Sequence, residues 1–115
     1  MRENMIKTRT FGFSLNIIEI YKQLREEGEY VLSKQLLRSA TSIGAQVVEA
    51  EAAQSKADFV TKMSIASKEA RETRYWLALL QESKLTNLDM AAAVGEVENI
   101  INILTAIVKT AKENK

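Results

Sequence analysis

The sequence predicts an all-α protein, an antiparallel up-down-up-down four-helix bundle that associates with copies of itself. The 115 residues include no proline and only four glycines, so little interrupts a helix. Hydrophobic residues make up 46% of the chain and charged residues 27%, a balance typical of amphipathic helices. Apolar side chains recur at helical spacing in four segments separated by short polar turns. We expect one bundle domain at residues 10–112, preceded by a disordered or frayed lead at residues 1–9.

The segment 56–83 carries the clearest helical pattern. One row of side chains repeats at the spacing of a helix that packs along its whole length, with bulky residues at both ends and small ones in the middle. We expect this row to face the core. Its members are Phe59, Met63, Ala66, Ala70, Thr73, Leu77 and Leu80.

A second row on the same segment sets Glu69 and Glu72 among apolar residues next to Trp76. A buried carboxylate without a cation is costly, so a cationic partner is expected from another helix. If the chain turns at residues 53–55, the preceding helix runs antiparallel and facing positions sum to about 108. Arg38 then lies beside both carboxylates, and we predict a structural ion pair.

Two other predicted helices have apolar faces wider than one neighbour would cover. The first runs from Thr10 to Glu27 and ends at Gly28, which can adopt the left-handed conformation of a helix stop. The last is expected at residues 88–112. We therefore expect apolar surface to remain after one bundle closes, which favours self-association.

Capping residues place the remaining boundaries. Ser33 is the expected N-cap of a helix that runs to about Ala53, and Gly44 inside it is expected to mark close approach of another backbone. Ser55 and Asp58 resemble a capping box at the start of the segment 56–83.

The absence of histidine and cysteine excludes the usual nucleophilic triads, disulfides and thiolate metal sites. A metal or acid/base cluster of Glu49, Glu69 and Glu72 is the alternative to the ion pair, and without histidine we favour the ion pair. We predict that the protein is not an enzyme and binds no cofactor or metal. No secretory signal or apolar run of membrane length is evident, so we expect a cytoplasmic protein without a membrane partner.

The net charge of +1 makes nucleic-acid binding depend on locally concentrated cations. Lys68, Arg71 and Arg74 are the candidates for contact with phosphate, and a solvated helix face is the alternative. Tyr75 and Trp76 either stack on a base or pack in the core or at a subunit interface.

Three blocks of sequence resemble a known family. They read LLRSATSIGAQVVEA at residues 36–50, SKADF at 55–59 and KEARETRYWLALL at 68–80. These blocks resemble the bacterial four-helix-bundle family that is encoded in intervening sequences of large-subunit ribosomal RNA genes. The resemblance extends over about residues 10–110, and Gln46 departs from the asparagine that is common there.

The resemblance implies an up-down-up-down bundle that assembles into a ring-like homopentamer. It also implies a relation to the accessory variability protein of diversity-generating retroelements, a basic pentamer that binds nucleic acid and a reverse transcriptase. We therefore predict a non-catalytic, homo-oligomeric and pentameric scaffold that binds RNA or a ribonucleoprotein. The alternative is a pure protein-protein interaction module that does not bind nucleic acid.

Overall fold

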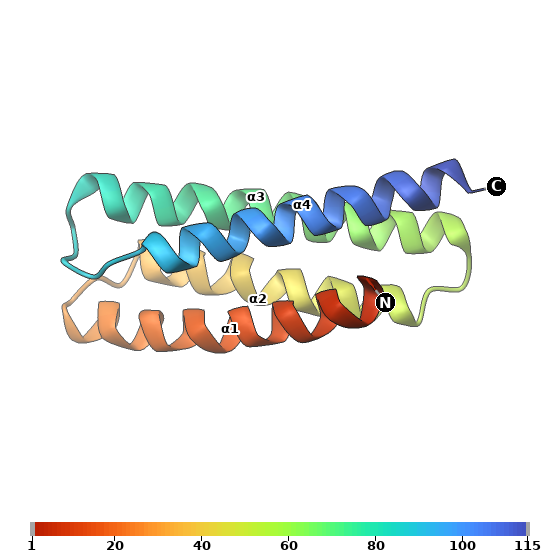
Figure 1. Ribbon diagram of the computed structural model, residues 1–115. Coiled ribbons are helices and arrows are strands. Elements are labelled where there is room, and N and C mark those ends of the chain that lie inside the picture. Colours follow the sequence, from red (N-terminus) through yellow and green to blue (C-terminus); the bar gives the residue numbers. More distant parts are fainter. Residues whose placement is uncertain (1, 115) are drawn as a thin grey trace.

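The computed structural model describes residues 2–114, with side chains from residue 5 onward, and this part of the chain forms four helices and no strands. The predicted all-α class is thus confirmed. Figure 1 shows the helices lying lengthwise side by side in a rod of 49 × 20 × 20 Å, with the α2–α3 connection at one end and the other two connections at the opposite end. The helices are α1 (Arg2–Glu26), α2 (Leu32–Glu51), α3 (Lys56–Ser83) and α4 (Ala91–Glu113).

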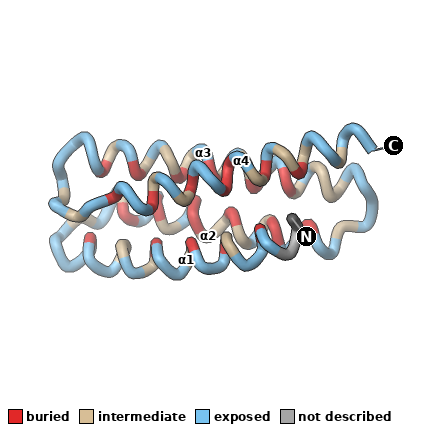
Figure 2. The backbone as a smooth tube through the Cα atoms, viewed as in Figure 1, coloured by how far each residue is buried: buried red, intermediate tan, exposed pale blue. Residues whose placement is uncertain are grey.

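The core runs along the middle of the rod. α1 and α3 each pack against α2 and α4, and buried positions line the inner side of all four helices (Figure 2). Of the seven residues predicted to face the core from α3, Phe59 is half-buried and the other six are fully buried. The predicted core face of this helix is confirmed, because a regular spacing of apolar residues already defines which side of a helix is buried.

α1 begins at Arg2 and so includes residues that were expected to form a frayed lead. Ile6 and Thr10 are buried and continue the inner row of Phe13 and Ile17 toward the N-terminus. The Thr10 hydroxyl donates a hydrogen bond to the Ile6 carbonyl oxygen at 2.8 Å, which satisfies a polar group inside the core. Because Thr10 is polar, its place in the inner row hid the fact that the apolar pattern of α1 continues to Ile6.

Gly28 ends α1 as predicted, with φ at +88°. The Glu29 N–H donates to the Leu24 carbonyl at 2.9 Å, and the Gly28 N–H donates to the Arg25 carbonyl at 2.9 Å. These two bonds form the Schellman arrangement, which satisfies carbonyls that a helix end leaves without partners.

The prediction of Ser33 as N-cap of α2 is wrong. α2 begins at Leu32, and the Glu29 carboxylate accepts the N–H groups of Val31, Leu32 and Ser33 at 3.2, 3.1 and 2.6 Å. The Ser33 hydroxyl instead donates to the Glu29 carbonyl at 2.7 Å. A longer acidic side chain, folding back from the preceding turn, takes the role that was expected of a serine.

α3 begins as its capping pattern predicts. Ser55 Oγ accepts the Asp58 N–H at 3.1 Å, and the Asp58 carboxylate accepts the Gln54 N–H at 3.3 Å. At its other end Lys84 takes the left-handed conformation, with φ at +60°. The helix is thus closed by a side chain at its start and by backbone conformation at its end.

α4 begins at Ala91, three residues later than expected. The Asp89 carboxylate accepts the Ala91 N–H at 2.9 Å. Thr86 accepts the Leu88 N–H at 3.1 Å and donates to the Glu27 carboxylate at 2.7 Å. Polar side chains thus hold the segment before Ala91 as a turn against the end of α1.

By length and composition α4 is long and apolar enough to cross a membrane, contrary to the expectation that no run approaches that length. Its apolar positions are used within the bundle. Three half-buried side chains, Val94, Ile103 and Val108, pack against the core. A core helix of a bundle meets the same criterion, because it is rich in the same residues. The buried residues of α4 are Ala93, Val97, Ile100, Ile101, Leu104 and Ile107.

Candidate functional site

The structure places Arg38 of α2 between the two glutamates of α3. Arg38 Nη1 lies 3.5 Å from Glu69 Oε1, and Nη2 pairs with Glu72 Oε2. The Arg38 side chain is 48% exposed, whereas those of Glu69 and Glu72 are 16% and 31% exposed. The ion pair therefore lies at the edge of the α2–α3 interface rather than inside it, and water screens it.

Trp76 extends this cluster. Its indole Nε1 donates to Glu72 Oε2 at 3.0 Å, so one carboxylate joins the guanidinium and the indole. Tyr75 lies edge-on to Trp76 with ring centroids 5.3 Å apart, and 57% of Tyr75 is exposed. The four-residue spacing of Glu72 and Trp76 was the signal for their bond, because such residues are neighbours on a helix surface. Tyr75 is the more accessible aromatic.

The three candidate phosphate contacts lie on the surface of α3. Lys68 and Arg71 are exposed and Arg74 is half-buried. Arg71 Nη2 donates to Thr105 Oγ1 of α4 at 3.4 Å, so Arg71 lies on the side of α3 that faces α4, and Arg74 follows it by one turn. Within residues 5–114, none of the three forms an ion pair. Their charges are available to a ligand.

Arg71 also borders a small pocket between α3 and α4. The pocket has a volume of about 210 Å³ and is lined by Ser64, Ser67, Arg71, Thr105 and Val108. Sequence reasoning missed it because its walls come from two helices whose relative register is set only by packing. The spacing of Ser64, Ser67 and Arg71 along one side of α3 was the signal that could have indicated it.

An open apolar groove of about 690 Å³ lies on the surface where α1 packs against α2. Phe11 and Val48 line it and are 66% and 50% exposed. Gly44 forms part of its floor, where an added Cβ would lie 3.5 Å from Thr10 Oγ1. The two backbones do approach closely at Gly44, as expected, but a methyl group would still fit.

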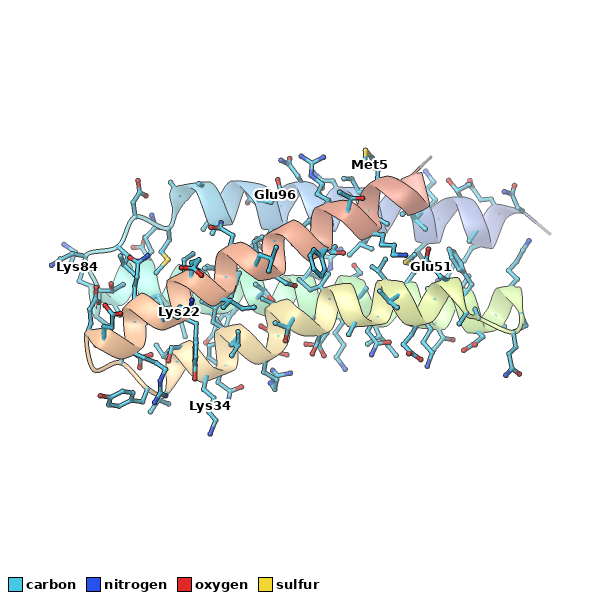
Figure 3. All side chains as sticks on the ribbon, turned by 90° about the horizontal axis from the view of Figure 1, so that it is seen from below. Met5, Lys22, Lys34, Glu51, Lys84 and Glu96 are labelled. Atoms are coloured by element: carbon cyan, nitrogen blue, oxygen red, sulfur yellow. The ribbon has the colours of Figure 1, made fainter. Side chains whose placement is uncertain are left out.

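Two ion pairs join α1 to its two neighbouring helices. Lys7 Nζ lies 3.0 Å from Glu51 of α2, and Arg9 Nε donates to Glu96 of α4 at 2.7 Å. Figure 3 shows Glu51 and Glu96, the acidic partners that α2 and α4 present to α1. The hydrogen bond from Arg9 and the charge of Glu96 raise the pKa of Arg9 above its ordinary value, so Arg9 stays cationic throughout the physiological range.

Metal-ligating residues do not gather in this structure. Over the described part of the chain, no group of three or more acidic, histidine or cysteine side chains is positioned to hold a metal ion. Glu69 and Glu72 instead face a cation, Arg38. The surface around Arg38, Glu69 and Glu72 therefore offers hydrogen bonds and charge rather than ligands for a metal ion.

A model of the 23S rRNA-intervening sequence protein family matches residues 2–106 of the sequence. The chain belongs to this family. A solved structure from Bacteroides thetaiotaomicron VPI-5482, described as a protein with unknown function from the S23 ribosomal protein family, is 44% identical. The match covers 95% of this chain and 99% of that one, with a TM-score of 0.90. No curated protein matches the sequence.

These comparisons establish the family and agree with the fold. The family match begins at residue 2, and α1 also begins there, so the first turns belong to the shared domain. The solved relative has no assigned function, so family membership supplies a fold and no reaction.

Proposed function

We propose that the protein is a non-catalytic scaffold, an antiparallel up-down-up-down bundle that assembles into a homopentameric ring and binds RNA or a ribonucleoprotein. The observation that carries this proposal is the open groove between α1 and α2, which leaves Phe11 66% exposed. Burying a large apolar side chain is favourable by about 1.5–3 kcal/mol, so copies gain free energy by covering this groove.

A second copy of the chain is the occupant that we propose for the groove. Two helices form its walls, and a groove of this kind accepts the apolar face of a third helix. The net charge of +1 leaves little repulsion between copies. A closed ring needs two different patches on each copy, and Val31, directly before α2, supports the second because it is 72% exposed and lies outside the groove.

The unpaired cations of α3 support the nucleic-acid part of the proposal. Lys68, Arg71 and Arg74 lie on a helix remote from the groove, so assembly through α1 and α2 leaves them accessible. A ring repeats the same cations on every copy and thereby concentrates charge that one near-neutral chain lacks. The family takes its description from ribosomal RNA intervening sequences, which makes RNA the first ligand to test.

Three narrower predictions belong to this proposal. The relation to the accessory variability protein of diversity-generating retroelements would make reverse transcriptase a protein partner to test. A cytoplasmic location follows from the proposed RNA ligand. The packing of α4 in the bundle core supports the expectation of no membrane partner.

The experiment measures mass by light scattering over a range of protein concentrations. The unaltered protein is expected to show about five times the 12.9 kDa chain mass. Phe11→Asp/Val48→Asp is expected to reduce the mass to that of a single chain with unchanged helix content, because it places charge in the groove. Leu85→Asp is the matched control, because Leu85 is 55% exposed but lies outside the groove.

Two outcomes would contradict the proposal. Folded single chains at every concentration of the unaltered protein would remove the assembly. Failure of the assembled protein to retain RNA, together with a stable protein partner in a pull-down, would favour the protein-protein interaction module instead.

A further inference from the structure

The pocket between α3 and α4 adjoins the cations of the proposed nucleic-acid surface. Pockets that hold drug-sized ligands have volumes of roughly 300–1,000 Å³. This pocket, at about 210 Å³, is smaller and suits one compact group rather than a whole nucleotide. Its lining combines three hydroxyl-bearing residues with one guanidinium and a single apolar side chain. Size and lining together indicate a small group that accepts hydrogen bonds.

Two hydroxyls in the pocket have no hydrogen-bond partner in the described part of the chain. Serine and threonine in helices commonly donate to the carbonyl one turn earlier, and Thr61, Thr73 and Thr105 do so here. The hydroxyls of Ser64 and Ser67 have no hydrogen-bond partner among the residues that the structure describes. They are free to donate to a ligand.

Arg71 supplies positive charge at the same place. One of its amino groups donates to Thr105 Oγ1, a long bond of 3.4 Å that holds the side chain against the pocket wall. The remaining guanidinium donors face no carboxylate in the described structure, and a guanidinium matches the oxygens of a phosphate in geometry. Arg74 and Lys109 each follow a pocket residue by one helical turn and add charge of the same sign.

We infer that this pocket binds one phosphodiester group of an RNA backbone, with Ser64, Ser67 and Arg71 as the hydrogen-bond donors. Hydroxyls and guanidinium groups are the usual partners of backbone phosphates, which fix the position of a strand without reading its sequence. The inference rests on the proposed function, because it names the contact through which the scaffold holds RNA. It also adds two uncharged donors that a general electrostatic surface would not need.

The test measures retention of a single-stranded oligouridylate over a range of salt concentrations. Ser64→Ala/Ser67→Ala is expected to weaken binding about tenfold, because a charged phosphate loses two donors. The slope of log affinity against log salt is expected to stay unchanged, since hydroxyls displace no counterions. Ser42→Ala/Ser83→Ala is the matched control, because those hydroxyls donate to their own helices. Unchanged affinity in the pocket variant would overturn the inference.

A second variant distinguishes an error in the pocket assignment from an error in the proposed RNA binding. Arg71→Glu/Arg74→Glu is expected to weaken retention and flatten its salt dependence. If these changes weaken binding and the serine changes do not, the nucleic-acid surface stands and the pocket assignment fails. If the unaltered protein retains no RNA, both the RNA function and the RNA assignment of the pocket fail.

A titration with inorganic phosphate, followed by NMR of backbone amides, examines the pocket directly. Shifts near Ser67 and Thr105 that vanish in Ser64→Ala/Ser67→Ala would support phosphate binding at this place. Their absence would overturn it. Phosphate shifts in a protein that retains no RNA would instead assign the pocket to a free phosphate and reject the RNA backbone as its ligand.

Discussion

Glu29 shows how one side chain can set a helix boundary from outside the helix. Its carboxylate accepts three consecutive backbone N–H groups at the start of α2 and so satisfies donors that would otherwise lack partners. The negative charge also lies at the positive end of the helix dipole. The usual capping residues are short, and sequence reasoning therefore chose Ser33, whose hydroxyl here donates rather than accepts.

Replacing Glu29 by alanine is expected to lower the free energy of unfolding by about 0.5–2 kcal/mol, the usual loss when a cap is removed. Urea unfolding at one fixed protein concentration measures the change, because self-association would otherwise alter the apparent stability. Glu26→Ala is the matched control, since Glu26 is exposed at the end of α1, and its effect should stay within about 0.5 kcal/mol. Equal losses in the two variants would reject the capping role.

At the scale of helices, α2 and α3 are joined by small residues in the core and by polar contacts at the edge. Ala66 and Ala70 are fully buried, which allows the two backbones to lie close together. Thr73 Oγ1 lies 2.8 Å from Ser39 Oγ across the buried interface. Arg38 adds its ion pair where the interface meets solvent. The interface is therefore built mainly by packing, and the ion pair adds register.

A double-mutant cycle of Arg38→Met and Glu72→Gln tests whether the ion pair contributes less to the α2–α3 interface than packing does. The coupling free energy is expected to be about 0.2–1 kcal/mol, because the Arg38 side chain is half-exposed and its charge is screened. The exposed pair of Lys22 and Glu19 within α1 provides a control cycle with an expected coupling of at most about 0.5 kcal/mol. A coupling of 3 kcal/mol or more, typical of a buried pair, would show that the guanidinium is dehydrated in the assembled protein.

At the scale of the whole molecule, the bundle closes its core and still leaves large apolar side chains exposed. We expected the surplus on both the first and the last helix. Among the described residues, the large exposed apolar side chains include Phe11 and Leu15 of α1 and Val48 of α2, but none from α4. The wide apolar face of α4 packs against α1 and α3. Phe11 and Val48 lie together in the α1–α2 groove, which therefore offers a partner an apolar hollow to fill.

The variant Gly44→Ala is expected to change the stability of one chain and the assembly of several chains in opposite directions. In a mid-helix position the change is expected to raise the free energy of unfolding by about 0.5–1 kcal/mol, because alanine loses less backbone entropy than glycine on entering a helix. The new methyl group would make only ordinary contacts with Thr10. It also makes the groove shallower and should weaken assembly in light scattering. Gly95→Ala on α4 is the control, since nothing lies within 4 Å of an added Cβ there, and it should give the stability gain alone. Equal assembly in the two variants would place the interface elsewhere.

The parts of the structure that could be predicted from the sequence are those that depend on neighbouring residues. The inner row of α3, the stop at Gly28 and the cap at Ser55 each depend on residues within a few turns of one another. The position of Arg38 beside Glu69 required only one further fact, a short turn between two helices. The start of α1 was missed because a satisfied threonine occupies an inner position, which a pattern of apolar residues does not reveal.

The sequence by itself determined the four helices, the buried side of α3 and the pairing of α2 with α3, because helical periodicity and short turns are properties of neighbouring residues. Only the tertiary structure decided that the surplus apolar surface lies on α1 and α2 rather than on α4, and that Ser67 and Thr105 border one pocket. The physical reason is that exposure depends on which other helices cover a side chain, and that covering is settled by the packing of all four helices together.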